Sequence, residues 1–78
     1  MTNILLLKAK LMELGLTQDQ LAEMIGISKA SLSYKINNRR DFTISETLKI
    51  QKALGLTREE RDQIFFAKDV DLGSTELA

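Results

Sequence analysis

The 78-residue chain contains no cysteine, histidine, tryptophan or proline. The absence of cysteine excludes a disulfide framework and a thiolate metal site, and it is typical of proteins in a reducing compartment. Without histidine or cysteine, the usual acid–base and nucleophile pairs of enzymes are missing, and the carboxylates fall at predicted helix caps or on solvent faces. We therefore expect a protein that is not an enzyme and that uses no metal, no cofactor and no small-molecule ligand.

Long apolar runs are also missing. The opening apolar run, 4–7, is short, and Lys8 and Lys10 follow it, whereas a signal peptide has its basic residues first. No segment is long enough to cross a membrane. Hydrophobic residues make up 44% of the chain, which is enough for one compact core. These features predict a single soluble domain in the cytoplasm.

The formal net charge is zero, but the charges are unevenly distributed. Residues 1–40 contain six basic and three acidic residues, whereas residues 41–78 contain five basic and eight acidic ones. A local field steers a charged partner more than the net charge does. The N-terminal half is therefore the half suited to a polyanion.

Apolar residues at helical spacing, bounded by capping residues and glycines, predict an all-α fold of four or five helices. The first helix is expected over about 4–14, two short helices over 17–37, a fourth from the cap at Thr43 to Leu54, and a fifth from the cap at Thr57 to about Ala67. A polar loop is expected over 37–41. We expect one folded domain over 1–67 and a tail over 68–78, which is either flexible or an arm that docks on a partner subunit through Val70 and Leu72.

The segment 17–36 has the pattern of two helices joined by a sharp bend. Thr17 and Gln20 form a capping box, and Gly26 is placed where the first helix must end in a left-handed turn. A β-branched residue at Gly26 is expected to be strained and also to splay the two helices. The pair is held by apolar residues on facing sides: Leu16, Leu21, Ala22, Ile25, Ile27 and Leu32. This arrangement pushes the second helix outward.

This segment resembles the helix-turn-helix of the Cro and phage-repressor (Xre-like) family of bacterial and phage DNA-binding regulators. Gln18 occupies the start of the first motif helix, Ala22 the position that requires a small side chain, and Gly26 the turn. The resemblance extends over about the first 66 residues, including the basic loop 37–40. It departs at Lys35, where many members have an apolar residue.

The resemblance implies a sequence-specific regulator of transcription, most similar to a Cro-like repressor, that reads the major groove of double-stranded DNA with the helix at about 28–37. The expected base contacts are Lys29, Ala30, Ser33 and Tyr34, and the expected phosphate contacts are Gln18, Ser28, Lys35, Asn38, Arg39 and Arg40. The alternatives are a solvated Lys29, a Tyr34 half-buried over the following loop, and an arginine that pairs with Asp41 or Glu46.

Members of this family typically bind near-palindromic operators as dimers, which implies a homodimer, with a monomer as the alternative. Ile64, Phe65 and Phe66 are expected to form its interface, because adjacent residues of a helix point about 100° apart and one phenylalanine should remain exposed. The rival interpretation is a helical protein-interaction module, of the antitoxin or anti-repressor type, that binds a protein through the last helix.

Overall fold

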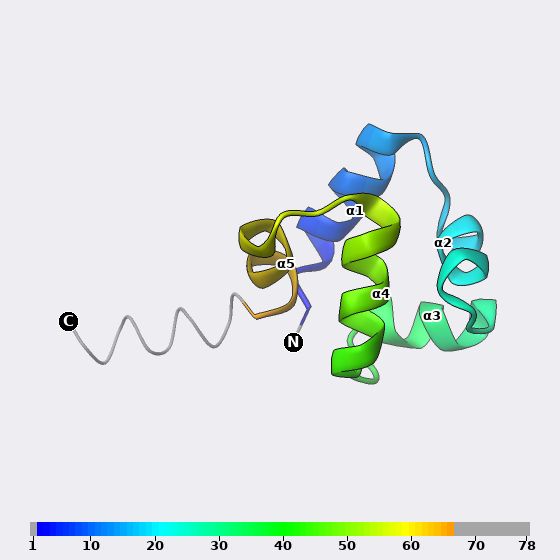
Figure 1. Ribbon diagram of the computed structural model, residues 1–78. Helices are drawn as coiled ribbons and strands as arrows, with labels where there is room; N and C mark the ends of the chain where they lie inside the picture. The colour runs from blue at the N-terminus through cyan, green and yellow to red at the C-terminus, as the bar shows by residue number, and fades with distance from the viewer. Residues whose placement is uncertain (1, 67–78) are drawn as a thin grey trace, which may run out of the picture.

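The computed structural model describes residues 2–66 and shows five helices and no strand in that range (Figure 1). They are α1 (Ile4–Leu14), α2 (Gln18–Ile25), α3 (Lys29–Ile36), α4 (Ile44–Leu54) and α5 (Arg58–Phe65). The predicted all-α fold is confirmed. The expected end of the last helix at Ala67 and the tail with Val70 and Leu72 lie outside the described residues.

Threonine side chains begin three of the helices. Thr17, Thr43 and Thr57 each accept a hydrogen bond from the third backbone N–H of the helix, and the glutamine or glutamate at that position accepts one from the threonine N–H. Two donors that the helix cannot satisfy are paired at each of these ends. The helix starts predicted from the sequence are confirmed because this chemistry is local.

Gly26 makes the bend between α2 and α3. Its φ of 78° is left-handed, and its N–H donates to the Ala22 carbonyl at 2.9 Å. A Cβ built at Gly26 would meet no heavy atom within 4 Å. A Cβ therefore has room at Gly26, which does not support the expectation that a side chain there splays the two helices, whereas the left-handed backbone does oppose one.

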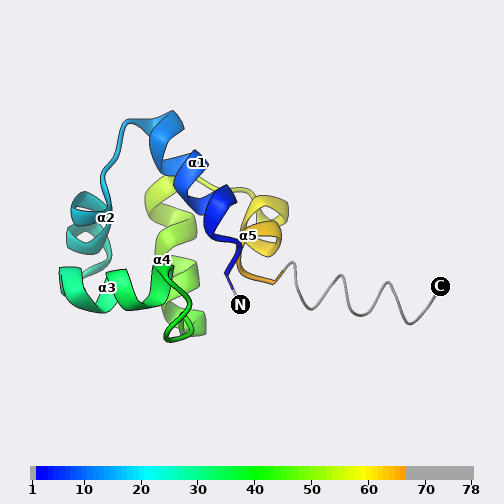
Figure 2. The same cartoon turned by 180° about the vertical axis from the view of Figure 1, so that it is seen from behind.

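The core lies where α4 packs against α1, α2 and α5, with α3 carried on α2 (Figures 1 and 2). All five helices contribute to it. Leu14 is 43% exposed because it lies at the end of α1. The buried apolar residues are Leu7, Leu11, Leu21, Ala22, Ile25, Leu32, Ile36, Ile50, Leu54, Leu56, Ile64 and Phe65.

The C-terminal end of α5 corrects the expected apolar interface. Ile64 and Phe65 are 3% and 6% exposed, and Phe66 is half-buried against the core. Ile64 and Phe65 are both buried because α5 packs against other parts of the protein on two sides. Ile64 borders a hollow between α1 and α5, whereas the Phe65 ring meets the Phe42 ring edge-on at a centroid distance of 5.3 Å. Ile64 and Phe65 therefore belong to the core of one subunit.

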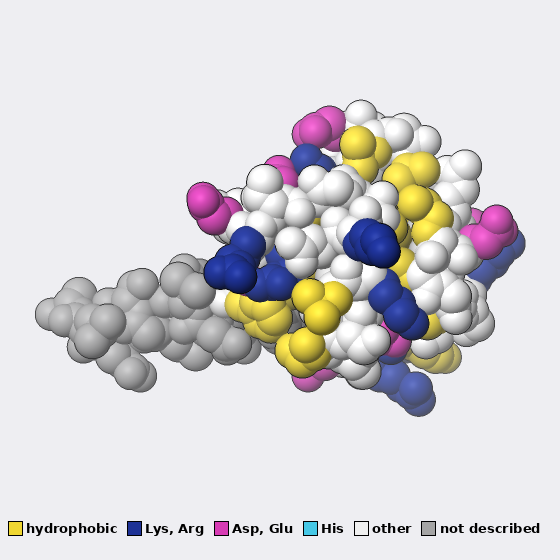
Figure 3. All heavy atoms as spheres, viewed as in Figure 1, with side chains coloured by type: hydrophobic (Ala, Val, Ile, Leu, Met, Phe, Trp, Pro, Cys, Tyr) yellow, Lys and Arg dark blue, Asp and Glu magenta, His cyan; other side chains and the backbone are white. Residues whose placement is uncertain are grey.

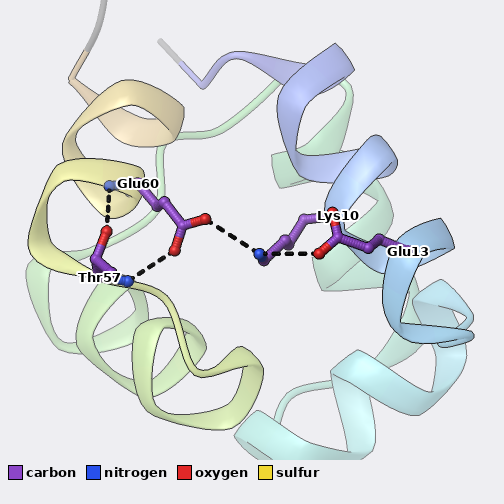
Figure 4. Close-up of polar contacts among 4 residues, drawn as sticks. All are labelled: Lys10, Glu13, Thr57 and Glu60. Carbon is purple, nitrogen blue, oxygen red and sulfur yellow. Dashed lines mark hydrogen bonds and ion pairs between the residues drawn. The ribbon is translucent and has the colours of Figure 1, made fainter.

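An ion-pair network holds α1 against α5 (Figure 4). Lys10 Nζ lies 3.1 Å from Glu60 Oε2 and 3.3 Å from Glu13 Oε1, while Glu60 Oε1 accepts from the Thr57 N–H at 2.9 Å. The hydrogen bonds to Glu60 and Glu13 raise the pKa of Lys10. Those from Thr57 and Lys10 lower the pKa of Glu60. The cap of α5 and the α1–α5 contact thus share one carboxylate.

No helix among residues 2–66 combines the length and the apolar character that crossing a membrane requires.

Candidate nucleic-acid interface

The outward face of α3 is fixed by its two core residues. Leu32 and Ile36 are 1% and 0% exposed, so the opposite side of the helix faces solvent. Lys29, Ala30 and Tyr34 are exposed there, and Ser33 is half-buried. The structure therefore brings together on one surface the four residues predicted to contact bases.

Lys29 at the start of α3 is tethered only weakly. Its Nζ lies 3.4 Å from Asp19 Oδ2 on α2, and both side chains are more than half exposed. An exposed pair of this kind contributes little to stability and is screened by salt. Lys29 is thus neither wholly solvated nor locked, and its ammonium group is accessible to a ligand.

Two arginines converge on one aromatic ring. The guanidinium carbons of Arg39 and Arg40 lie 5.9 Å and 6.0 Å from the centroid of the Tyr34 ring, close enough for cation–π attraction. Among residues 2–66, neither arginine makes a salt bridge, so the alternative pairing with Asp41 or Glu46 is not found. Tyr34 is 45% exposed, and the positive charges of the two arginines lie next to its ring, beside the outward face of α3.

The loop after α3 turns sharply at Asn38. This residue has a φ of 60°, the single positive value among the non-glycine residues described. The Arg39 N–H donates to the Tyr34 carbonyl at 2.8 Å, which brings the arginines back over the end of α3. The Asn38 side chain, expected on phosphate, instead accepts from the Thr2 N–H and donates to the Thr2 carbonyl. Its amide therefore has a partner within the protein.

Lys35 is the clearest correction to the predicted phosphate contacts. It is 8% exposed, and its ammonium group donates to both carboxylate oxygens of Glu46, at 2.6 Å to Oε1. Glu46 also closes the capping box with Thr43. Burial acts to raise the pKa of Glu46, but the hydrogen bonds from Lys35 and Thr43 outweigh it and hold that pKa below its usual range. Lys35 joins α3 to the start of α4, and its ammonium group is buried in this ion pair and not exposed on the surface.

A model of the helix-turn-helix family matches residues 7–61, which is most of the chain and contains all of α2, α3 and α4. The chain belongs to this family. The protein is a DNA-binding helix-turn-helix regulator of the Cro and phage-repressor (Xre-like) type, as the resemblance implied. No match was found among curated proteins, and none among solved structures.

The first turns of α2 and α3 in this regulator carry the remaining predicted phosphate contacts. The Ser28 hydroxyl caps α3 by accepting from the Ser31 N–H at 3.0 Å. Gln18, the first residue of α2, borders a hollow of about 260 Å³ that Lys8 also lines. Lys8 is exposed and was not singled out from the sequence, because nothing local places the middle of α1 beside the start of α2.

The contact between Thr2 and Asn38 was likewise not predicted, because the two residues are 36 positions apart in the sequence. The spacing between Thr43 and Glu46 predicted that Glu46 caps α4, but it did not predict that Glu46 also pairs with Lys35. Among residues 2–66, no cluster of acidic or other ligating side chains could hold a metal ion.

Proposed function

We propose that this regulator recognises specific sites on double-stranded DNA and acts as a Cro-like repressor, with α3 lying in the major groove. The observation that supports this most is the composite surface of α3 and its following loop. On it, small and polar side chains are exposed beside two arginines that have no acidic partner among the described residues.

Base reading falls to the first turns of α3. Lys29 can donate to guanine O6 and N7, Ala30 can contact a thymine methyl group, and Ser33 can donate to or accept from several bases. The exposed edge of Tyr34 is suited to a sugar or a methyl group. The contact of Lys29 with Asp19 is long and exposed, so little stability is lost when the ammonium group turns to a base, which favours this assignment.

Phosphate binding falls to Arg39 and Arg40, with Ser28 and Gln18 at two helix starts. A guanidinium presents a planar fork that fits phosphate oxygens, and the N–H groups of a helix start favour an anion. These contacts position the protein on any duplex and carry no sequence information. Lys35 is not among them, because its charge is already neutralised by Glu46.

The regulator is expected to bind near-palindromic operators as a homodimer. One eight-residue recognition helix covers only a few base pairs, and a second copy doubles the contacts. Because Ile64 and Phe65 are buried, the proposed dimer interface is formed by Ile44 and Leu48 on α4, which are 64% and 48% exposed and lie one helical turn apart. Apolar side chains reach the surface around α4 in Figure 3.

Selection of binding sites from random duplexes, followed by titration of the selected site, tests this function. Lys29→Ala is expected to weaken the selected site by about 1–3 kcal/mol and to relax preference at one or two base pairs. Lys52→Ala, which removes an exposed lysine from the last turn of α4, is the matched control and should leave the preference unchanged. If wild type does not shift any duplex at moderate salt, the protein-interaction alternative is favoured instead.

A further inference from the structure

The start of the chain is fastened to the loop that carries the two arginines. The Thr2 N–H donates to Asn38 Oδ1 at 3.1 Å, and Asn38 Nδ2 donates back to the Thr2 carbonyl at 3.3 Å. We call this reciprocal pair the Thr2–Asn38 clamp. Thr2 is buried and Asn38 half-buried, so water competes less for these bonds than at an open surface.

The clamp is anchored on a second side. The Asn3 N–H donates to the Ile64 carbonyl at 2.6 Å, and the Asn3 side chain caps α1. Residues 2 and 3 therefore connect the end of α5 to the loop after α3, and the start of the chain lies beside the end of α5 in both ribbon views (Figures 1 and 2). The loop is held by a part of the molecule that lies far from it in sequence.

Asn38 adopts a backbone conformation that a non-glycine residue rarely takes, and its side chain is what the clamp holds. The turn at Asn38 allows the Arg39 N–H to reach the Tyr34 carbonyl at 2.8 Å. That bond sets the direction in which Arg39 and Arg40 leave the loop, and both guanidinium groups lie over the Tyr34 ring. The clamp thus acts on the arginines through one backbone turn.

We propose that Asn38 is a positioning residue for the two arginines. Its hydrogen bonds to the backbone of Thr2 hold Arg39 and Arg40 over Tyr34, in the arrangement that binds the DNA backbone. This inference rests on the proposed phosphate-binding role of the two arginines. Ordering a flexible side chain at an interface is unfavourable, and a protein that has ordered it beforehand binds more tightly. The side-chain amide of Asn38 therefore favours DNA binding by ordering the two arginines beforehand, and not by contacting phosphate itself.

The first test needs no DNA. Tyr34 is the single tyrosine and the chain has no tryptophan, so the tyrosine band of the near-ultraviolet circular dichroism spectrum reports on this ring alone. Asn38→Gly keeps a backbone that tolerates the turn but removes the clamp. We expect the band to weaken, and the NMR contacts between the Tyr34 ring and the two arginines to disappear, while far-ultraviolet helix content is unchanged.

Two variants at Thr2 distinguish the effect of its backbone N–H, which belongs to the clamp, from the effect of its side chain. Thr2→Pro removes the N–H that donates to Asn38, whereas Thr2→Val retains it and removes only the hydroxyl. Thr2→Pro should reproduce the loss of the tyrosine band seen in Asn38→Gly, and Thr2→Val should resemble wild type. An unchanged band in both Asn38→Gly and Thr2→Pro, in proteins that remain folded, overturns the proposal.

Titration with a random duplex supplies the second test. Asn38→Gly and Thr2→Pro should each bind roughly two- to tenfold more weakly than wild type, with the same dependence on salt, because both arginine contacts still form in the complex. In the Arg39→Ala/Arg40→Ala background the same changes should have no further effect. If they weaken binding equally there, Asn38 acts independently of the arginines and the proposal is wrong. If wild type binds no DNA, the proposed function fails, and the spectroscopic test still decides the clamp.

Discussion

The ammonium group of Lys35 donates to both carboxylate oxygens of Glu46, which fixes α3 to the first turn of α4. The same carboxylate caps α4 through Thr43, so a single side chain serves both the start of one helix and the packing of another. The two side chains are 10% and 14% exposed. A pair this well buried is strongly disrupted when only one partner is removed, because the other is left unpaired.

Lys35→Met should therefore lower the free energy of unfolding by roughly 2–3 kcal/mol, as measured by urea denaturation. It should leave the slope of log K against log salt for DNA unchanged at temperatures where the variant is folded, because Lys35 does not release a counterion from phosphate. Adding Glu46→Gln to Lys35→Met should cause a smaller further loss than Glu46→Gln causes alone, since the two residues share one interaction. A reduced salt slope in Lys35→Met would restore the phosphate contact expected from the sequence.

The free energy of unfolding should decrease at acidic pH because Glu46 and Glu60, the two carboxylates that cap α4 and α5, become protonated. The pKa values of Glu46 and Glu60 are both below the ordinary value of 4.5. A lowered pKa contributes stability that is present above the ordinary value and is lost as the pH falls through the folded-state pKa. The raised pKa of Lys10 acts oppositely: its contribution is present below the ordinary value of 10.5 and is lost as the pH rises through the folded-state value.

Between these limits stability should change little, because the chain contains no histidine. Urea midpoints measured against pH test this pattern. Glu46→Gln keeps a residue that can close the capping box but removes the titrating group, so its acid decline should be shallower than that of wild type. A steep change near neutral pH would contradict the assignment.

Arg39→Ala and Arg40→Ala should each weaken binding to a selected site and to a random duplex by the same factor. Each should also flatten the slope of log K against log salt by about 0.9. Lys52→Ala, at the far end of α4, serves as the control for the loss of one positive charge. An unchanged slope in either arginine variant would remove that residue from the proposed phosphate contacts.

Features that depend on neighbouring residues could be predicted from the sequence. The threonine caps and Gly26 determine where helices begin and end, so their positions were confirmed. The side of α3 that faces outward likewise carries residues expected to contact bases, because the helical spacing of Leu32 and Ile36 turns the opposite side into the core. Local hydrogen bonds and helical periodicity determine both features, and neither needs knowledge of the rest of the fold.

Features that depend on tertiary contacts could not be predicted in this way. Lys35 was expected to contact phosphate, whereas it is buried against Glu46, a partner that lies on another helix. An exposed residue was expected at 64–66 from the angles within α5, which do not reveal that α1 packs on this helix and that Phe42 covers Phe65. The hydrogen bonds of the Asn38 side chain could not be predicted because Thr2 lies 36 positions away in the sequence.

The assembly of the regulator gives the last prediction. Ile44 and Leu48 lie on α4, which begins shortly after the arginine-bearing loop, and a dimer joined there would carry two copies of α3. DNA then requires half-sites about 34 Å apart, one helical turn. Leu48→Glu places a charge in this surface and should leave the helix content intact, because Leu48 is 48% exposed.

Sedimentation at micromolar concentration should show a dimer for wild type and a monomer for Leu48→Glu. Met12→Glu makes the same change on α1, at a side chain that is 82% exposed, and should remain dimeric. Leu48→Glu should also weaken binding to a two-half-site operator far more than to a single half-site, since only the former gains from the second copy. If Met12→Glu is the variant that dissociates, the interface lies on α1. A wild type that is monomeric alone and on its operator would refute the homodimer itself.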